Sequence, residues 1–155
     1  MLMDKDFFMK EALKEAMKAY ELEEIPIGAV IVKDGEIIAR GYNRKETDKD
    51  ATLHGEMIAI REACNKLGAW RLLGCTMYVT LEPCSMCAGA IVNSRIENLV
   101  IATKDYRTGA CGSVMNIVQN ENLNHRVNVE FGVMEQEASN LIKEFFIKLR
   151  NRVGK

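Results

Sequence analysis

The first forty residues carry two kinds of hydrophobic pattern. Between residues 4 and 21 the apolar side chains recur every three or four positions, which predicts an amphipathic helix; they are Phe8, Ala12, Leu13, Ala16, Met17 and Tyr20. Two short apolar runs follow at 27–32 and 36–42, and Asp34-Gly35 separates them. Because a tight turn between strands needs positive φ at both positions, which Asp and Gly tolerate, these runs predict a β-hairpin.

The rest of the chain alternates between helical and β-rich segments. The expected elements are helices at 53–67, 83–93 and 141–150, and strands at 76–81, 98–103 and 127–133. Gly68 is expected to end the first of these helices, and a short helix is expected between the last two strands. Alternating strands and helices favour one α/β domain, in which helices cover both faces of a five-stranded mixed sheet.

The composition is that of a folded globular protein. The chain has 155 residues, of which 48% are hydrophobic and 28% charged, and its formal net charge is −1. A chain of this length can bury a core without disulfides, so we expect a single domain over 1–155. No apolar run reaches the ~18 residues that a membrane span needs, and the N-terminal residues lack the pattern of a signal peptide. We therefore expect a cytoplasmic protein without a membrane partner.

Two motifs combine residue types that bind metals. His54-Gly55-Glu56 and Pro83-Cys84-Ser85-Met86-Cys87 each lie where a helix is expected to begin, and Cys84 and Cys87 share one helix face. The chain has five cysteines, an odd number, which favours metal binding or catalysis over a disulfide framework. One histidine and two thiolates favour zinc, and three ligands leave a position for a water. Glu56 would then lie beside that water as a proton shuttle.

Other interpretations of these residues stay open at this point. A Cys-x-x-Cys pair also occurs as a redox pair or as half of a structural zinc site. A fourth ligand would close the site and remove the catalytic position; the candidates are Cys64, Cys75, Cys111 and His125.

The combination His-x-Glu and Pro-Cys-x-x-Cys resembles the signature of the zinc-dependent nucleoside and nucleobase deaminases. The similarity extends beyond this motif. The chain also resembles the bacterial tRNA-specific adenosine deaminases in segments 25–30, 41–44, 78–84, 86–90, 93–96, 108–109 and 124–127. This resemblance implies a cytidine-deaminase-like α/β/α fold and a hydrolase acting on the C–N bonds of cyclic amidines. The implied reaction converts the wobble adenosine, position 34 of the tRNA anticodon loop, to inosine.

The resemblance also implies roles for individual residues. His54, Cys84 and Cys87 match the ligands of one Zn²⁺ per subunit, and Glu56 matches the proton shuttle. Substrate contacts are implied for Asn43, for Asp105, and for Phe145 or Phe146. A homodimer that binds the anticodon stem-loop is implied as well. Gly55 departs from the family, which usually has Ala between the His and the Glu.

Charge is concentrated at the C-terminal end. The segment 140–155 has a net charge of +4, because Glu144 is opposed by Lys143, Lys148, Arg150, Arg152 and Lys155. A local basic patch of this kind can bind RNA phosphates although the total charge is near zero. Two other functions remain as alternatives. One is deamination of a small molecule, guanine or a cytosine nucleoside, and the other is a non-catalytic zinc module.

Overall fold

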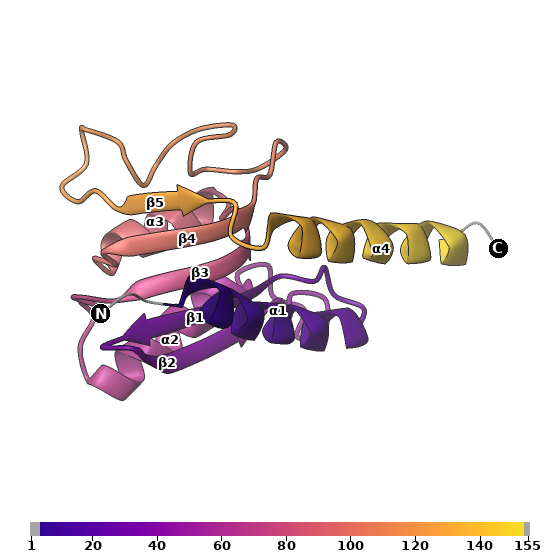
Figure 1. The fold of residues 1–155 in the computed structure, drawn as a ribbon, viewed down its shortest axis with the longest axis horizontal. Coiled ribbons are helices and arrows are strands. Elements are labelled where there is room, and N and C mark those ends of the chain that lie inside the picture. The colour runs from indigo at the N-terminus through magenta and orange to yellow at the C-terminus, as the bar shows by residue number, and fades with distance from the viewer. Residues whose placement is uncertain (1–3, 154–155) are drawn as a thin grey trace.

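In the computed structural model, which describes residues 4–153, the chain forms four helices and five strands. Their order is α1 (Lys5–Glu21), β1 (Gly28–Lys33), β2 (Glu36–Tyr42), α2 (Gly55–Leu67), β3 (Thr76–Leu81), α3 (Ser85–Asn93), β4 (Asn98–Thr103), β5 (Asn128–Phe131) and α4 (Glu135–Val153). The strands form one sheet in the order β2-β1-β3-β4-β5 (Figure 1). β1 is antiparallel to β2 and β3, whereas β3, β4 and β5 are parallel, which confirms the predicted mixed sheet.

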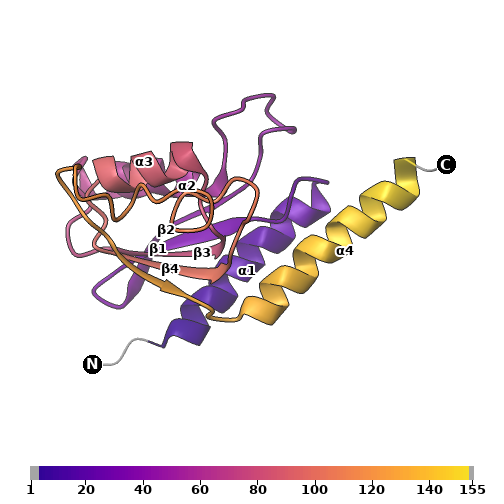
Figure 2. The same ribbon diagram turned by 90° about the horizontal axis from the view of Figure 1, so that it is seen from above.

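The helices form two layers on opposite faces of the sheet. α1 and α4 run side by side on one face, and α2 and α3 lie on the other (Figure 2). Each face has its own cluster of buried apolar side chains. The three-layer α/β/α architecture expected from the sequence is therefore confirmed. No helix in the span 4–153 has both the length and the apolar character needed to cross a bilayer.

Local sequence signals explain several of the element boundaries. The Asp4 carboxylate accepts a hydrogen bond of 3.0 Å from the Phe7 amide, which caps the first turn of α1. Asp34 and Gly35 have φ values of 51° and 78°, as the hairpin turn requires. Gly68 adopts the left-handed conformation, with φ of 63°, and ends α2.

Three sequence-based expectations for the second half of the chain are wrong. The segment between β4 and β5 contains turns and one isolated bridge, Cys111 with Asn116, but no helix. β5 covers only Asn128–Phe131, and α4 begins at Glu135 rather than near residue 141. The first turns of α4 bury only Ala138, so no apolar stripe in the sequence marks where this helix begins.

Two glycines allow helices to lie directly on the sheet. A Cβ atom on Gly28 would lie 2.2 Å from the carbonyl oxygen of Ala12 in α1. A Cβ atom on Gly41 would lie 2.2 Å from the carbonyl oxygen of Gly55, at the start of α2. Because the backbones of Gly41 and Gly55 touch directly, the end of β2 sets the position of the N-terminus of α2. That N-terminus carries His54 and Glu56.

Candidate metal centre and active site

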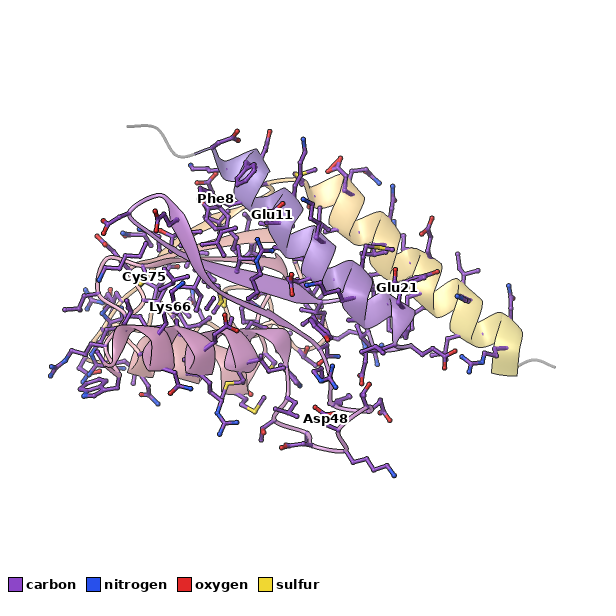
Figure 3. All side chains as sticks on the ribbon, turned by 90° about the horizontal axis from the view of Figure 1, so that it is seen from below. Phe8, Glu11, Glu21, Asp48, Lys66 and Cys75 are labelled. Carbon is purple, nitrogen blue, oxygen red and sulfur yellow. The ribbon has the colours of Figure 1, made fainter. Side chains whose placement is uncertain are left out.

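The candidate site lies at one end of the strands, where β1 begins and β2, β3 and β4 end. Strand pairing brings these ends together, since Gly28 pairs with Tyr42, Ala29 with Val79, and Leu81 with Thr103. Asn43, Cys84 and Asp105 follow the ends of β2, β3 and β4. Figure 3 shows that Cys75 and Lys66 lie close together, whereas Asp48, in the loop between β2 and α2, lies away from them.

Three side chains converge from the N-termini of α2 and α3. His54 and Cys84 are the N-cap residues of these helices, and neither side chain is used to cap its own helix. The Nδ1 atom of His54 lies 3.6 Å from the Sγ atom of Cys84 and 3.6 Å from the Sγ atom of Cys87. A tetrahedral zinc ion with ordinary Zn–N and Zn–S bonds separates its nitrogen and sulfur ligands by about 3.5 Å. The donor set and its spacing therefore fit Zn²⁺.

No fourth ligand from residues 4–153 completes this cluster. Within that span, His54, Cys84 and Cys87 are the one group of three or more His, Cys, Asp or Glu side chains close enough to hold a metal. His125 is used elsewhere, because its Nε2 atom lies 2.8 Å from the carbonyl oxygen of Ile96. Cys64, Cys75 and Cys111 do not join the group either. Three ligands with one open position are typical of a catalytic zinc site rather than a structural one.

Two buried polar atoms beside the cluster have no hydrogen-bond partner. They are Oδ1 of Asn43 and Oε1 of Glu56, on residues that are only 3% exposed, and no other buried side-chain oxygen or nitrogen of residues 4–153 lacks a partner. An unpaired buried polar atom is costly, so these two are expected to face a ligand. Burial raises the pKa of Glu56 to about 7, which suits a group that both takes and gives a proton near neutral pH.

The electrostatics of the cluster favour a thiolate. Hydrogen bonds from Cys87 and His54 outweigh the effect of burial and lower the pKa of Cys84 to about 3. The hydrogen bond to Cys84 raises the pKa of His54. A thiolate is the form of cysteine that binds a metal, and its position at a helix N-terminus also favours the negative charge.

A cavity of about 720 Å³ opens above the cluster. Asn43, His54 and Cys84 line its floor. Part of its wall comes from the segment after β4, and another part comes from α4, with Ser139, Ile142, Lys143 and Phe146. This volume is in the range of pockets that hold small ligands.

The structure separates the two phenylalanines of α4. Phe146 lines the cavity, whereas Phe145 is 7% exposed and packs against the ring of Tyr20 with the two centroids 6.2 Å apart. Both rings also border a second hollow of about 490 Å³. Of the two candidates that the sequence left open, Phe146 is the one that lines the same cavity as His54 and Cys84.

Asp105 lies in the cavity wall, but its carboxylate already has partners in its own loop. It accepts hydrogen bonds from the amide of Arg107 at 2.9 Å, and from the amide and hydroxyl of Thr108 at 3.2 and 2.9 Å. The carboxylate therefore shapes the turn at 105–108, and the side chains of this turn face the cavity.

Two buried glutamates beside the cavity have no role in the sequence-based assignment. Glu82, which is 2% exposed, bonds to the segment after β4, and Glu24, which is 1% exposed, bonds to Glu46 and Thr47 in the loop after β2. In the sequence, Glu82 stands out only as a charged residue between a β-rich run and a proline, in Leu81-Glu82-Pro83. This pattern does not show which segment the carboxylate contacts.

The basic C-terminal segment is only partly free. Lys143 lines the cavity, whereas the Nζ atom of Lys148 lies 5.1 Å above the ring of Tyr20 and Arg152 forms an ion pair with Glu23 at 2.8 Å. Lys155 lies outside the described residues.

The model of the MafB19-like deaminase family matches residues 3–150, so the chain forms a deaminase domain. The tRNA-specific adenosine deaminase of Bacillus subtilis (strain 168) is 51% identical over 147 residues, covering 95% of this chain and 91% of that protein. The enzyme of the same name from Aquifex aeolicus (strain VF5) is 51% identical over 151 residues, covering 97% and 99%.

A solved structure from a study of A-to-I editing by tRNA:A34 deaminases is also similar. It is 44% identical, its TM-score is 0.84, and the match covers 87% of this chain and 98% of that chain. The chain therefore belongs to the family of tRNA-specific adenosine deaminases. The resemblance inferred from the motifs is confirmed.

Proposed function

We propose that this chain hydrolyses the wobble adenosine, position 34 in the anticodon loop of tRNA, to inosine and ammonia, with one Zn²⁺ per subunit held by His54, Cys84 and Cys87. The observation that carries the proposal is the open three-ligand cluster with the unpaired Glu56 carboxylate beside it, at the floor of a cavity. Membership of the tRNA-specific adenosine deaminases supports the choice of substrate.

The chemistry needs a nucleophile and a proton carrier. Bound zinc would supply a water whose pKa is lowered to near ~7. Glu56 takes a proton from the attacking water and delivers it to N1 of adenine, while the oxygen adds to C6. Glu56 then takes the remaining proton from the new C6 hydroxyl group and donates it to the amino group, which leaves as ammonia while the C6 carbonyl of inosine forms. Its buried position and its pKa of about 7 let Glu56 hold a proton between these two transfers.

The walls of the cavity orient the nucleotide. Asn43 offers an unpaired buried Oδ1 atom, which accepts a hydrogen bond from a donor of the bound nucleoside. Phe146 provides an aromatic surface, and the turn at Asp105 forms another part of the wall. A base must leave its stack to reach the cavity floor, which is easier in an anticodon loop than in a duplex.

The proposal includes a homodimer in the cytoplasm. Partly exposed apolar side chains on the outer face of α2 and α3, among them Met57, Ile58 and Met86, are compatible with a partner surface there. Light scattering on the purified protein measures the mass of the assembly directly.

One incubation tests the reaction and separates it from its nearest alternative. The protein is incubated with a tRNA that carries adenosine at the wobble position, and in parallel with free adenosine, guanine and cytidine. We expect inosine at position 34 by sequencing. We expect little product from the free compounds, because they lack the remote RNA contacts whose binding energy supports the reaction. Faster turnover of free guanine or cytidine would instead identify a small-molecule deaminase. The Glu56→Ala protein serves as the inactive control.

A further inference from the structure

The buried carboxylate of Glu82 connects the metal-binding region to the segment 105–113. Glu82 lies at the end of β3, two residues before Cys84. Its Oε1 atom accepts hydrogen bonds from the Asp105 amide at 3.0 Å and the Ser113 hydroxyl at 2.5 Å. Its Oε2 atom accepts from the amides of Cys111 and Ser113 at 3.0 and 3.1 Å. All of these donors belong to one segment.

The fit around this carboxylate is close. A Cβ atom on Gly109 would lie 2.4 Å from the carboxyl carbon of Glu82 and 2.6 Å from its Oε2 atom, so only glycine leaves room for the carboxylate. The Ala110 amide also donates to the carbonyl oxygen of Pro83 at 2.8 Å. The segment 105–113 is thus attached to the residues immediately before Cys84 at several points.

The other contacts of this segment differ along its length. It contains no helix and no strand, and its regular pairing is limited to the single bridge from Cys111 to Asn116. Ala110 and Cys111 are buried in the core, whereas residues 106–108 are exposed, with Tyr106 at 76%. Hydrogen bonds to a buried carboxylate are strong and directional, and Glu82 forms four of them, at the start of the turn and beyond its end. The position of the exposed turn at 105–108 therefore depends on Glu82.

The segment matters because its first residues, 105–108, form one wall of the cavity. We propose that Glu82 is a positioning residue for the deamination reaction: it holds residues 105–108 where they receive the target nucleotide. Glu82 itself contacts no substrate in this assignment and acts only through the wall. The inference rests on the proposed function, because the substrate that the wall receives is the tRNA loop.

The test compares variants that remove different numbers of these hydrogen bonds. Glu82→Gln replaces one acceptor oxygen by an NH₂ group that faces two donors, and Ser113→Ala removes one bond and keeps the carboxylate. Glu15→Gln is the matched control, since Glu15 is 2% exposed and bonds Lys18 and Arg40 away from the cavity. For each protein we would measure zinc content, melting temperature, and kcat and KM with a tRNA anticodon stem-loop.

We expect Glu82→Gln to raise KM about tenfold or more, because small misplacements of a binding wall have large effects. Its kcat stays within about threefold of the parent, because Glu56 and the three metal ligands are unchanged. Ser113→Ala raises KM by a smaller factor, and Glu15→Gln leaves KM unchanged. A merely structural role would lower the melting temperature of Glu82→Gln without changing its KM in the folded range.

A second measurement does not depend on the substrate. Arg107 lies in the wall and is exposed, so trypsin cleavage after Arg107 in the native protein reports how firmly the wall is held. Faster cleavage is expected in Glu82→Gln and Ser113→Ala, but not in Glu15→Gln. Unchanged cleavage with an unchanged KM would overturn the inference, and so would loss of zinc in Glu82→Gln. If Glu82→Gln does not fold, the KM of Ser113→Ala decides. Failure of the parent protein to edit tRNA would instead overturn the proposed function.

Discussion

The floor and the mouth of the cavity are built in different ways. The floor comprises His54 and Cys84, which line the cavity, together with Cys87 and Glu56 beside them. All four lie at the N-termini of two helices on the same face of the sheet. The mouth is formed by residues 104–108, the loop after β2 and the side of α4, which come from separate parts of the chain. The floor depends on spacing along helices, whereas the mouth depends on contacts between segments far apart in the sequence.

This difference predicts different consequences of mutation. Changes in the floor are expected to abolish either metal binding or the chemical step, because each floor residue is assigned to one of these two roles. Changes at the mouth are expected to weaken capture of the substrate and leave the chemistry intact.

The largest effect is expected from Cys87→Ala. The substitution removes one of the three proposed zinc ligands, so zinc should fall from one per chain to a small fraction, and tRNA editing should be lost. Stability should fall too, because metal binding is coupled to folding. Atomic absorption, the editing assay and thermal melting measure these changes. Cys75→Ala is the matched control, because Cys75 is a buried cysteine just before β3, at the opposite end of this strand from Cys84. Full zinc content in Cys87→Ala would contradict the assignment of the floor.

The next effect separates chemistry from metal binding within the floor. Glu56→Gln keeps the shape of the side chain but cannot carry protons, so kcat should fall by about 10²–10⁴-fold or more while zinc stays bound. Glu62→Gln, on the exposed side of the same helix, should change kcat little. Turnover of Glu56→Gln within a few-fold of the parent would remove Glu56 from its role as proton carrier.

The sequence predicted the floor because short-range rules govern it. Helices and strands near the site follow from the apolar spacing and from the Asp34-Gly35 turn, and a Cys-x-x-Cys pair on a helix shares one face whatever surrounds it. The three-ligand cluster and the unpaired Glu56 oxygen are therefore where the motifs placed them. The sequence could not show that Gly41 and Gly55 touch, because that contact joins β2 to α2 through their backbones.

The mouth was harder to predict because side chains there bond to distant backbone groups. The segment after β4 was expected to contain a helix, but the amides of Asp105, Cys111 and Ser113 donate to Glu82. Other amides of the segment donate to its own carbonyl groups in turns rather than in a helix. Adjacent phenylalanines in α4 could not be distinguished either, since their burial depends on how the helix is rotated against α1. Only the structure shows that Phe145 faces Tyr20 and Phe146 faces the cavity.

The two phenylalanines provide a sharper test of the mouth. Phe145→Ala should lower the free energy of unfolding by about 3 kcal/mol, because it leaves a hole beside Tyr20. Phe146→Ala should lower stability less and raise KM for the tRNA stem-loop several-fold, because it removes an aromatic surface from the cavity. Stacking of a base on such a ring contributes about 1–3 kcal/mol to binding. Denaturant titration and steady-state kinetics measure the two quantities. The reverse pattern would show that Phe145 contacts the RNA.

The smallest effect concerns charge at the mouth. Lys104 and Lys143 line the cavity, whereas Lys148 and Arg152 do not, so the first two are better placed for RNA phosphates beside the bound nucleotide. The double variant Lys104→Gln with Lys143→Gln should weaken tRNA binding several-fold. It should also flatten the plot of log affinity against log salt by about two units, because each lysine that no longer neutralises a phosphate lowers the slope by about one.

Zinc content and the melting temperature should remain those of the parent, since neither lysine contacts the floor. The matched control neutralises Lys33 and Lys66. Lys66 lies in the last turn of α2 and Lys33 ends β1, whereas the cavity lies where these two elements begin. Removing these two charges lowers the net charge equally but should leave the slope within about half a unit, because long-range attraction is screened at physiological salt. Equal slopes in the two double variants would show that RNA capture depends on total charge rather than on the mouth. The contrast between floor and mouth would then rest on the aromatic ring of Phe146 and the wall held by Glu82.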